Sequence, residues 1–354
     1  MKSRPPLGVG VIGCGTITYW THLRTLASLS NVRVAGLADP DPHALTRAKQ
    51  LVDAPMFSEP DVLLASKDID AVVIASPAGL HAEHFRAACS AGKHVYLEKP
   101  VAHDAASLET IRACSEGTAL VLAVGHNYRF HPACQRLRQR LIAGSVGDIR
   151  ATFSNFVEPV EAANMPGWKH DRRDGGGVLL DLATHHIDLY RWFLQDELAQ
   201  ITADTRSLYS EQDSACVRAT SRSGVELCGY FAFTSSRSHR LTFHGTKGVL
   251  HLDMHAGEIT EVTNRRHGYG VRKRTVTGGA TNFGWRSRKL VQPSYNPSHR
   301  LALRAFVDGM TNPVRRHADL ATVDDGAAAL QAVLDAEAGA GCEGKTPSAG
   351  FVPP

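Results

Sequence analysis

Short apolar runs alternate with amphipathic stretches through the first third of the chain. The apolar runs predict strands at 7–12, 32–38, 71–75, 93–97 and 119–125. The amphipathic stretches predict helices at 19–29, 81–91 and 105–116. Strands that alternate with helices indicate βαβ units and a doubly wound parallel sheet. We therefore expect a first domain of this kind over residues 1–125.

The pattern changes beyond residue 125, where strand-like runs follow one another with tight turns between them. Helices are predicted at 132–143 and 181–194, and a final helical region at 298–312 and 324–338. Strands are predicted at 149–156, 201–208, 215–221, 225–233, 240–244 and 249–253. Tight turns join neighbouring strands of antiparallel sheets. We expect an α/β second domain over residues 126–354, with a large open, mainly antiparallel sheet.

Composition narrows the possible classes of protein. The chain has 354 residues, enough for two domains, and a net charge of +4 with 21% charged residues, which indicates neither a nucleic-acid nor a membrane partner. Its seven cysteines lack CxxC spacing, so we expect no disulfide framework and a cytoplasmic location. No run is apolar and long enough for a signal peptide or a membrane span.

A glycine-rich turn follows the first predicted strand, with the sequence Gly13-Cys14-Gly15-Thr16-Ile17-Thr18. In a dinucleotide-binding turn the first glycine permits the tight bend, and the second lets the backbone approach the pyrophosphate at a helix N-terminus. We therefore predict cofactor contacts at Gly13, Gly15, Thr16 and Ile17. Thr18 stands where a small residue is usual, and it should crowd the helix against the strand or shift the helix outward.

Asp39 ends the second predicted strand, at a spacing typical of the acid that binds the ribose 2′-hydroxyl. A carboxylate there repels a 2′-phosphate, so NAD is favoured over NADP. Asp41 is the alternative acid, and Asp39-Pro40-Asp41-Pro42 can also be read as a plain turn before a helix. Ser76, Pro77 and His81 follow another strand, at the sheet edge where cofactors bind; capping of a helix is their alternative role.

Two separated motifs carry the candidate catalytic residues. Glu98-Lys99-Pro100 follows a buried strand, and Asp181, His185 and Asp188 are spaced i, i+4 and i+7 on a predicted helix. An imidazole titrates near neutral pH, so His185 is the candidate base. Asp181 could hold a substrate hydroxyl or orient the imidazole, and Lys99 could stabilise negative charge on the reacting oxygen. Glu98 is predicted to anchor ribose or amide groups of the cofactor.

Other residues are assigned less specifically. Tyr128, Arg129 and Trp168 are candidates for the substrate pocket, although Arg129 could equally brace the two domains. His186 is expected to be a packed or surface residue. The eighteen histidines include no HExxH or Cys/His set, so we expect no metal.

A basic segment lies at residues 264–290. It contains eight cations, Arg265, Arg266, Arg272, Lys273, Arg274, Arg286, Arg288 and Lys289. It reads either as a solvated hairpin or as an arm that meets an anionic substrate or reaches across an oligomer.

Several of these motifs together resemble those of the Gfo/Idh/MocA family of oxidoreductases. They are GVIGCG at 10–15, ASPAGLH at 75–81, EKP at 98–100, NYRF at 127–130 and GGGVLLD at 175–181, which leads to His185. The resemblance implies a Rossmann domain followed by an α/β domain whose open sheet often forms an oligomer interface. It also implies catalytic roles for Lys99, Asp181 and His185. Thr18, and Ala183 in place of a common glycine, depart from the family pattern.

The resemblance and the motifs lead to one favoured function and two alternatives. The favoured function is an NAD-dependent dehydrogenase or ketoreductase that acts on a secondary alcohol or ketone of a sugar or cyclitol, in a homodimer or homotetramer. One alternative is a hydrolase or lyase that retains NAD and acts through transient oxidation. The other is a non-catalytic dinucleotide-binding regulator, for which Lys99, Asp181 and His185 would be unnecessary.

Overall fold

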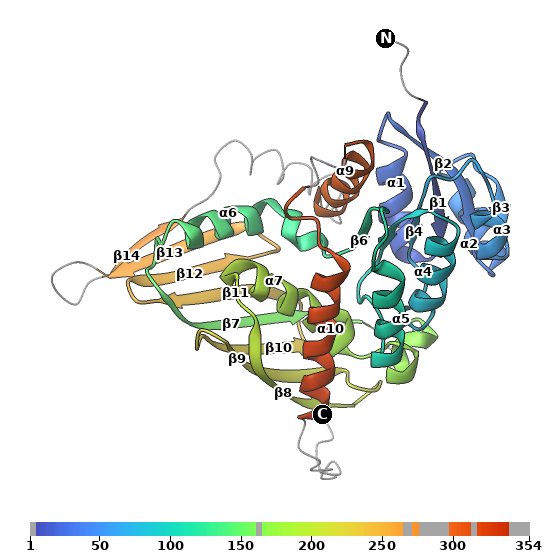
Figure 1. Ribbon diagram of the computed structural model, residues 1–354. Helices are drawn as coiled ribbons and strands as arrows, with labels where there is room; N and C mark the ends of the chain where they lie inside the picture. The colour runs from blue at the N-terminus through green and yellow to red at the C-terminus, as the bar shows by residue number, and fades with distance from the viewer. Residues whose placement is uncertain (1–4, 161–164, 265–270, 276–296, 313–316, 340–354) are drawn as a thin grey trace.

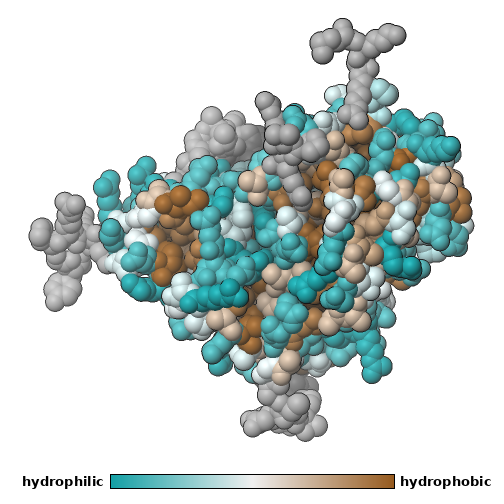
Figure 2. All heavy atoms as spheres, viewed as in Figure 1, coloured by the Kyte–Doolittle hydropathy of each residue, from teal (hydrophilic) through white to brown (hydrophobic). Residues whose placement is uncertain are grey.

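The computed structural model describes residues 5–160, 165–264, 271–275, 297–312 and 317–339 (Figure 1). Two sheets lie side by side in it, one in the N-terminal part of the chain and a larger one in the middle part. Both were predicted from the sequence. In the space-filling view of Figure 2, hydrophilic residues cover much of the visible face, and hydrophobic residues form separate patches. Among the described residues, no helix has both the length and the apolar character needed to cross a membrane.

The first sheet has six parallel strands in the order β3-β2-β1-β4-β5-β6. The strands are β1 (Leu7–Ile12), β2 (Val32–Ala38), β3 (Met56–Phe57), β4 (Ala71–Ile74), β5 (His94–Leu97) and β6 (Leu122–Val124). β1 and β4 are buried along their whole length, as strands covered on both faces must be. The order reverses between β1 and β4, and ligands of such sheets bind at the carboxyl ends of the strands beside this point.

Helices cover both faces of this sheet. They are α1 (Leu23–Leu26), α2 (Pro42–Lys49), α3 (Pro60–Leu64), α4 (His81–Ser90) and α5 (Ala105–Ser115). The first helix differs from the prediction, because a π-helical turn over Thr18–His22 precedes α1. The predicted turn at Asp39-Pro40-Asp41-Pro42 is also present, and Asp41 caps α2 through a hydrogen bond from the His43 backbone N–H of 2.9 Å.

The second sheet has eight strands in the order β14-β13-β12-β11-β7-β10-β9-β8. They are β7 (Ile149–Val157), β8 (Leu198–Arg206), β9 (Ser214–Ser221), β10 (Glu226–Ala232), β11 (Ser238–Gly245), β12 (Gly248–Asp253), β13 (Glu258–Asn264) and β14 (Val271–Thr275). All neighbours are antiparallel except β7 and β10. Helices α6 (Pro132–Ile142), α7 (Thr184–Leu194) and α10 (Val323–Ala338) lie against one face (Figure 1).

The sequence prediction missed the last two strands of this sheet. β13 and β14 pair as a hairpin, and β14 holds Arg272, Lys273 and Arg274 with exposed side chains at the sheet edge. A row of cations is one of the ways in which proteins protect an edge strand from further pairing. The hairpin interpretation of the basic segment is therefore confirmed for these three residues. Its other five cations lie outside the described residues.

The end of the chain returns to the first domain. Helix α9 (Pro297–Thr311) contributes Leu303 and Phe306 to the apolar cluster that also contains Val9 and Tyr96 of the parallel sheet. The rings of Tyr96 and Phe306 are 5.7 Å apart, and the backbone N–H of Val124 donates to the carbonyl of Ala321. The division of the chain at residue 125 stays a prediction, but the core of the first domain draws on residues from the far end of the sequence.

Candidate active site

The glycine-rich turn has the shape that a bound dinucleotide requires. Gly13 has φ +91°, and a Cβ added to it would lie 2.6 Å from the backbone of Ala75 and Ser76 at the end of β4. Gly15 is different, because no described atom lies within 4 Å of its added Cβ. This open space is where the pyrophosphate of a dinucleotide approaches the backbone, and the helix that starts at Thr16 directs its first N–H groups there. The residues present therefore fit the cofactor.

Thr18 is accommodated by the local structure. Its side chain is fully buried, and its hydroxyl donates a 2.6 Å hydrogen bond to the carbonyl of Gly13. The π-helical turn that starts at Thr18 is wider than an α-helical turn. This turn and the internal hydrogen bond give the larger side chain a place; an outward shift of the helix stays a prediction.

Asp39 lies directly at the glycine-rich turn. Its Oδ2 accepts from the backbone N–H of Cys14 at 2.7 Å, and its Oδ1 accepts from the N–H of Asp41 at 2.8 Å. Each carboxylate oxygen has a further lone pair, so Asp39 can still accept from a ribose hydroxyl. Since Asp41 caps α2, the geometry favours Asp39 over Asp41 as the acid that faces a ribose.

His81 connects two loops at the carboxyl edge of the sheet. It is 1% exposed, and its ring nitrogens lie 2.8 Å from the carbonyl oxygen of Pro100 and 2.9 Å from that of Ser76. The Ser76 hydroxyl lies 2.9 Å from Nδ1 of His84, and Pro77 directly precedes a single 3₁₀ turn. His81 therefore positions the loops on which Ser76, Pro77 and Lys99 lie, and direct cofactor contacts of these residues stay a prediction.

The two motifs that carry the candidate catalytic residues meet at Asp181, as the sequence predicted. Nζ of Lys99 donates to Oδ1 and to the backbone carbonyl of Asp181, both at 2.8 Å. Nζ of Lys169 donates to Oδ2 at 2.7 Å. Burial would raise the pKa of Asp181, but the charges of Lys169 and Lys99 outweigh it and hold that pKa well below its usual range. Asp181 is therefore a carboxylate held between two cations.

Lys169 was missed by the sequence analysis, because it lies in a loop without any periodic pattern. The glycines at 175–177 were the available signal. Gly175 and Gly177 have φ +94° and +91°, and a Cβ on Gly176 would lie 2.4 Å from the carbonyl oxygen of Lys169. Gly176 thus lets the chain fold back closely on the segment that carries Lys169. The same loop holds Trp168, whose ring lies 5.4 Å from Nζ of Lys169.

His185 lies beside this ion pair in a buried position. It is 8% exposed, and its ring lies 4.6 Å from that of Tyr128, measured between centroids. Burial lowers the pKa of His185 well below its usual range, and the nearby Lys99 and His126 lower it further. His185 is therefore neutral at physiological pH, and its Nδ1 has no hydrogen-bond partner among the described residues. A neutral imidazole with a free nitrogen can accept a proton.

Arg129 serves as a brace between elements. Its guanidinium is buried, and it bonds to Asp188 of α7 (2.6 Å from Nη2 to Oδ1) and to Asp325 of α10 (3.0 Å from Nη2 to Oδ1). These partners match the brace, the second of the two roles that the sequence left open for Arg129. Asp188, the third residue of the predicted helical stripe, thereby holds the helix that carries His185. His186 is packed as expected, with its nitrogens against Ser154 and His239.

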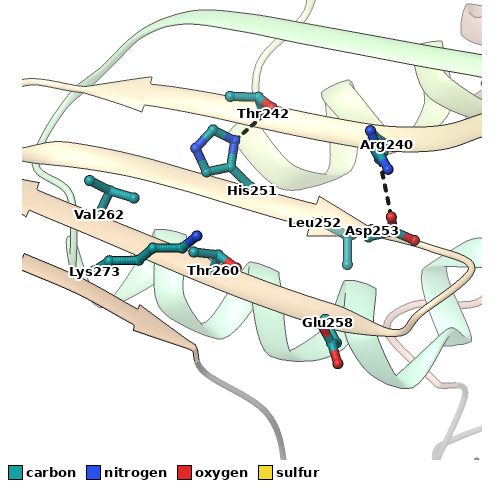
Figure 3. A pocket seen from close by; sticks show the side chains of 9 residues that line it. All are labelled: Arg240, Thr242, His251, Leu252, Asp253, Glu258, Thr260, Val262 and Lys273. Carbon is teal, nitrogen blue, oxygen red and sulfur yellow. Dashed lines mark hydrogen bonds and ion pairs between the residues drawn. The ribbon is translucent and has the colours of Figure 1, made fainter.

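A separate pocket lies on the strands β11–β14 of the second sheet (Figure 3). Its volume is about 510 Å³, and polar side chains such as Thr242, His251 and Thr260 line it. The hydroxyl of Thr242 lies 3.1 Å from the His251 ring, and Arg240 pairs with Asp253. None of the predicted catalytic residues lines this pocket, so it is distinct from the Lys99 site.

Comparison with known proteins decides the family. Residues 7–126 match the model of an oxidoreductase family with an NAD-binding Rossmann fold, and residues 134–251 match the GFO/IDH/MocA C-terminal domain. A dTDP-3,4-didehydro-2,6-dideoxy-alpha-D-glucose 3-reductase from Actinomadura kijaniata is 30% identical over 257 residues, which cover 70% of this chain and 75% of that protein. The chain belongs to the Gfo/Idh/MocA family of oxidoreductases.

Other relatives of this family member agree in sequence and in fold. The inositol 2-dehydrogenase of Rhizobium meliloti (strain 1021) is 28% identical over 68% of this chain and 74% of its own length. Levoglucosan dehydrogenase in complex with NADH superposes with a TM-score of 0.79 at 19% identity, over 94% of this chain and 97% of that one. A 3-ketoreductase from Actinomadura kijaniata, in complex with NADP and TDP-benzene, superposes with a TM-score of 0.78 at 22% identity, over 95% of this chain and 98% of that one. At these identities the two structures show the fold alone.

The two glycines of the turn should respond differently to alanine. Gly13→Ala places a Cβ against rigid backbone at a positive φ, so the variant should lose stability, and its melting temperature should fall by several degrees. Gly15→Ala should melt like the wild type but bind dinucleotide at least about tenfold more weakly, because the methyl group fills the space of the pyrophosphate. Thermal melting and calorimetry measure both effects. Normal dinucleotide affinity of Gly15→Ala would contradict the assignment.

Buried neutral histidines should make the fold sensitive to mild acid. Burial lowers the pKa of several of them, including His126, His185, His186 and His239, with that of His186 lowered to about 3. In the unfolded chain a histidine takes up a proton near pH 6.5, so the unfolded state binds more protons below that pH. Stability should be highest above pH 6.5 and fall by up to about 1.4 kcal/mol per pH unit for each such group as the pH drops toward 5.

Melting temperatures between pH 7.5 and 5 test this expectation. His186→Gln should flatten the pH dependence, whereas substitution of the exposed His43 by Gln should leave it unchanged. A melting temperature that stays level, or rises, as the pH falls from 7.5 to 5 would show that these histidines are not buried and neutral.

Proposed function

We propose that this family member is an NAD-dependent dehydrogenase that acts on a secondary alcohol, or in reverse a ketone, of a sugar or cyclitol. The observation that carries the proposal is the Lys99–Asp181–Lys169 cluster beside the neutral His185. Oxidation of an alcohol needs a base for the hydroxyl proton and a positive group for the charge that develops on oxygen. Both the base and the positive group are present in this cluster of side chains.

His185 is the proton acceptor in this proposal. Its imidazole is neutral before the reaction, so the ring can take the hydroxyl proton. Bound NAD supplies the hydride acceptor. When His185 takes the proton it becomes a cation in a buried site, where Asp181 favours this charge and burial and Lys99 oppose it, so the proton is readily released again. The same residues run in reverse to donate a proton to the oxygen of a ketone.

Lys99 has a donor left for the substrate. An ammonium group has three N–H donors, and Lys99 uses two of them on the carboxylate and the carbonyl of Asp181. The third can donate to the reacting oxygen and stabilise its negative charge. Lys169 uses one donor on Asp181, so its others can hold a neighbouring hydroxyl of a polyol. Two cations and one carboxylate leave the cluster with a net positive charge, which suits a developing oxyanion.

The relatives indicate the substrate class. One is named for the reduction of a keto-deoxysugar nucleotide and another for the oxidation of inositol. A six-membered ring with oxygen atoms on adjacent carbons is common to both, as carbonyls at C3 and C4 in the sugar nucleotide and as hydroxyls in inositol. The donors of Lys99 and Lys169, which meet at one carboxylate, fit such adjacent oxygens. Cytoplasmic location and a homodimer or homotetramer stay predictions. Strands β11–β14, with their polar pocket, offer a surface for a second copy of the chain.

Asp39 supports NAD as the cofactor. Its carboxylate is bonded to the N–H of Cys14 in the glycine-rich turn, which supports a role for it in binding the adenosine ribose, and its charge would oppose a 2′-phosphate. Arg47 of α2, which lies over the ring of Tyr19 at 5.3 Å, is the residue that could instead attract such a phosphate. Two backbone hydrogen bonds fix the carboxylate of Asp39 at the turn. We therefore expect Asp39, rather than the more flexible Arg47, to determine the cofactor preference.

Substitutions of the cluster should separate chemistry from binding. His185→Ala and Lys99→Ala should each lower kcat by about 100-fold or more, because each removes a group that acts on the reacting oxygen. Lys169→Ala should mainly raise KM, because the group it removes holds a second hydroxyl. The exposed Lys67 provides the matched control, and Lys67→Ala should have wild-type kinetics.

Steady-state production of NADH from a panel of inositols, free sugars and anhydrosugars measures these constants, starting with myo-inositol and levoglucosan. Full activity of both His185→Ala and Lys99→Ala on a substrate that the wild type oxidises would refute the site assignment. Binding of NAD without any release of NADH across the panel would favour the hydrolase or lyase that retains its cofactor.

The charge of Asp39 should set the cofactor preference. Asp39→Asn keeps an acceptor for the Cys14 N–H but removes the negative charge, so the ratio of NADP to NAD affinity should rise at least about tenfold. Asp41→Asn is the control, because asparagine is an equally good helix cap and the preference should not change. Calorimetric titration with each cofactor gives the ratios. A wild-type protein that prefers NADP would overturn the role of Asp39.

A further inference from the structure

Three residues from distant parts of the chain meet beneath the Glu98-Lys99-Pro100 loop. His22 ends the π-helical turn after the glycine-rich loop, Glu98 follows β5, and His299 lies in the first turn of α9. His22 is fully buried, Glu98 is 7% exposed and His299 is partly buried. One ligand atom from each residue lies within 4.8 Å of the others.

Several polar atoms of this cluster lack hydrogen-bond partners. Nδ1 of His22 and Nδ1 of His299 are buried without such a partner among the described residues, whereas Nε2 of His22 pairs with Oε1 of Glu98 at 2.9 Å. The hydroxyl of Tyr96, two residues before Glu98 on the same face of the strand, is also buried without one. Buried polar atoms are nearly always satisfied, since leaving one unpaired is costly. Several such atoms around one point indicate that a bound group satisfies them.

The distances are also those of ligands that share one metal ion. Nε2 of His22 lies 2.9 Å from Oε1 of Glu98, so these two side chains are already paired at the point where an ion would be bound. When two ligand atoms each lie about 2.1 Å from an ion and the ligand–ion–ligand angle is close to a right angle, the two atoms are about 3 Å apart. A ligand atom of His299 lies within 4.8 Å of both, so the three side chains surround one point that a metal ion can occupy.

The donor set is that of a transition-metal site. Two imidazoles and one carboxylate ligate zinc in several enzymes and iron(II) in others, whereas magnesium and calcium prefer oxygen alone. The single negative charge of the carboxylate is offset by a divalent ion. The second carboxylate oxygen of Glu98 accepts from the backbone N–H of Lys99 at 3.2 Å, which orients the ligand as supporting hydrogen bonds do in metal sites.

We propose that His22, Glu98 and His299 bind one divalent transition-metal ion, with Zn²⁺ as the matching probe. The ion joins the helix after the glycine-rich loop, the end of β5 and the start of α9. Its ligand Glu98 directly precedes Lys99 in the chain. The ion does not touch the reacting atoms, so its role is to hold the loop that carries Lys99. This differs from the sequence expectation of no metal, which rested on local motifs. It does not depend on the proposed function.

Metal content and metal-dependent stability test the site. The protein is purified without a metal-affinity step, stripped with a chelator, and titrated with Zn²⁺ by calorimetry and thermal melting. Co²⁺ serves as a second probe, because its visible absorption reports nitrogen and oxygen ligation. We expect about one ion per chain, a raised melting temperature and a Co²⁺ spectrum. His299→Gln and Glu98→Gln should weaken binding at least about tenfold and lose the rise in melting temperature.

A matched control separates this site from adventitious binding. His251→Gln removes an exposed histidine on the second sheet and should bind Zn²⁺ as the wild type does. If the wild-type protein takes up no stoichiometric ion and shows no Co²⁺ spectrum, the cluster is a hydrogen-bonded group and the proposal fails. It also fails if His299→Gln and Glu98→Gln bind the ion as tightly as the wild type. Neither readout uses enzyme activity, so failure here leaves the proposed function unaffected.

Discussion

The buried ion pair between Arg129 and Asp188 is the interaction on which the candidate active site depends. It joins the segment that leaves the last strand of the parallel sheet to α7, and Asp325 extends it to the capped N-terminus of α10. Three elements from separate parts of the chain are therefore fixed at one guanidinium. Removing one partner of such a buried pair leaves an uncompensated charge and costs about 3–5 kcal/mol. The positions of Asp181 and His185 relative to Lys99 follow from this junction.

Most of the architecture could be predicted because the apolar pattern was unambiguous. The strands β1 and β2 begin and end where their apolar runs do, and α7 continues the predicted stripe of Asp181, His185 and Asp188. The pairing of Lys99 with Asp181 was predictable for a simpler reason. A buried ammonium and a buried carboxylate are each costly without a partner, and the opposite charges of Lys99 and Asp181 compensate each other.

The remaining features depend on contacts that no local pattern encodes. Lys169 reaches Asp181 only because Gly176 lets two stretches of backbone approach each other closely. The sequence pattern predicts regular α-helices in these two regions, but each contains a wider π-helical turn, at Thr18–His22 and at Leu179–Ala183. Strand β13 and the edge strand β14 contain few apolar residues, so they lacked the apolar alternation that revealed their neighbours.

The return of α9 to the first domain bears on how the chain is made. The apolar cluster of the N-terminal sheet includes Leu303 and Phe306, which leave the ribosome long after Val9 and Tyr96. Until then the nascent domain exposes the apolar surface that α9 later covers, and contacts of such long sequence separation form slowly. The N-terminal half of this protein is therefore expected to need chaperone protection during synthesis, even though its βαβ units resemble those of domains that fold alone.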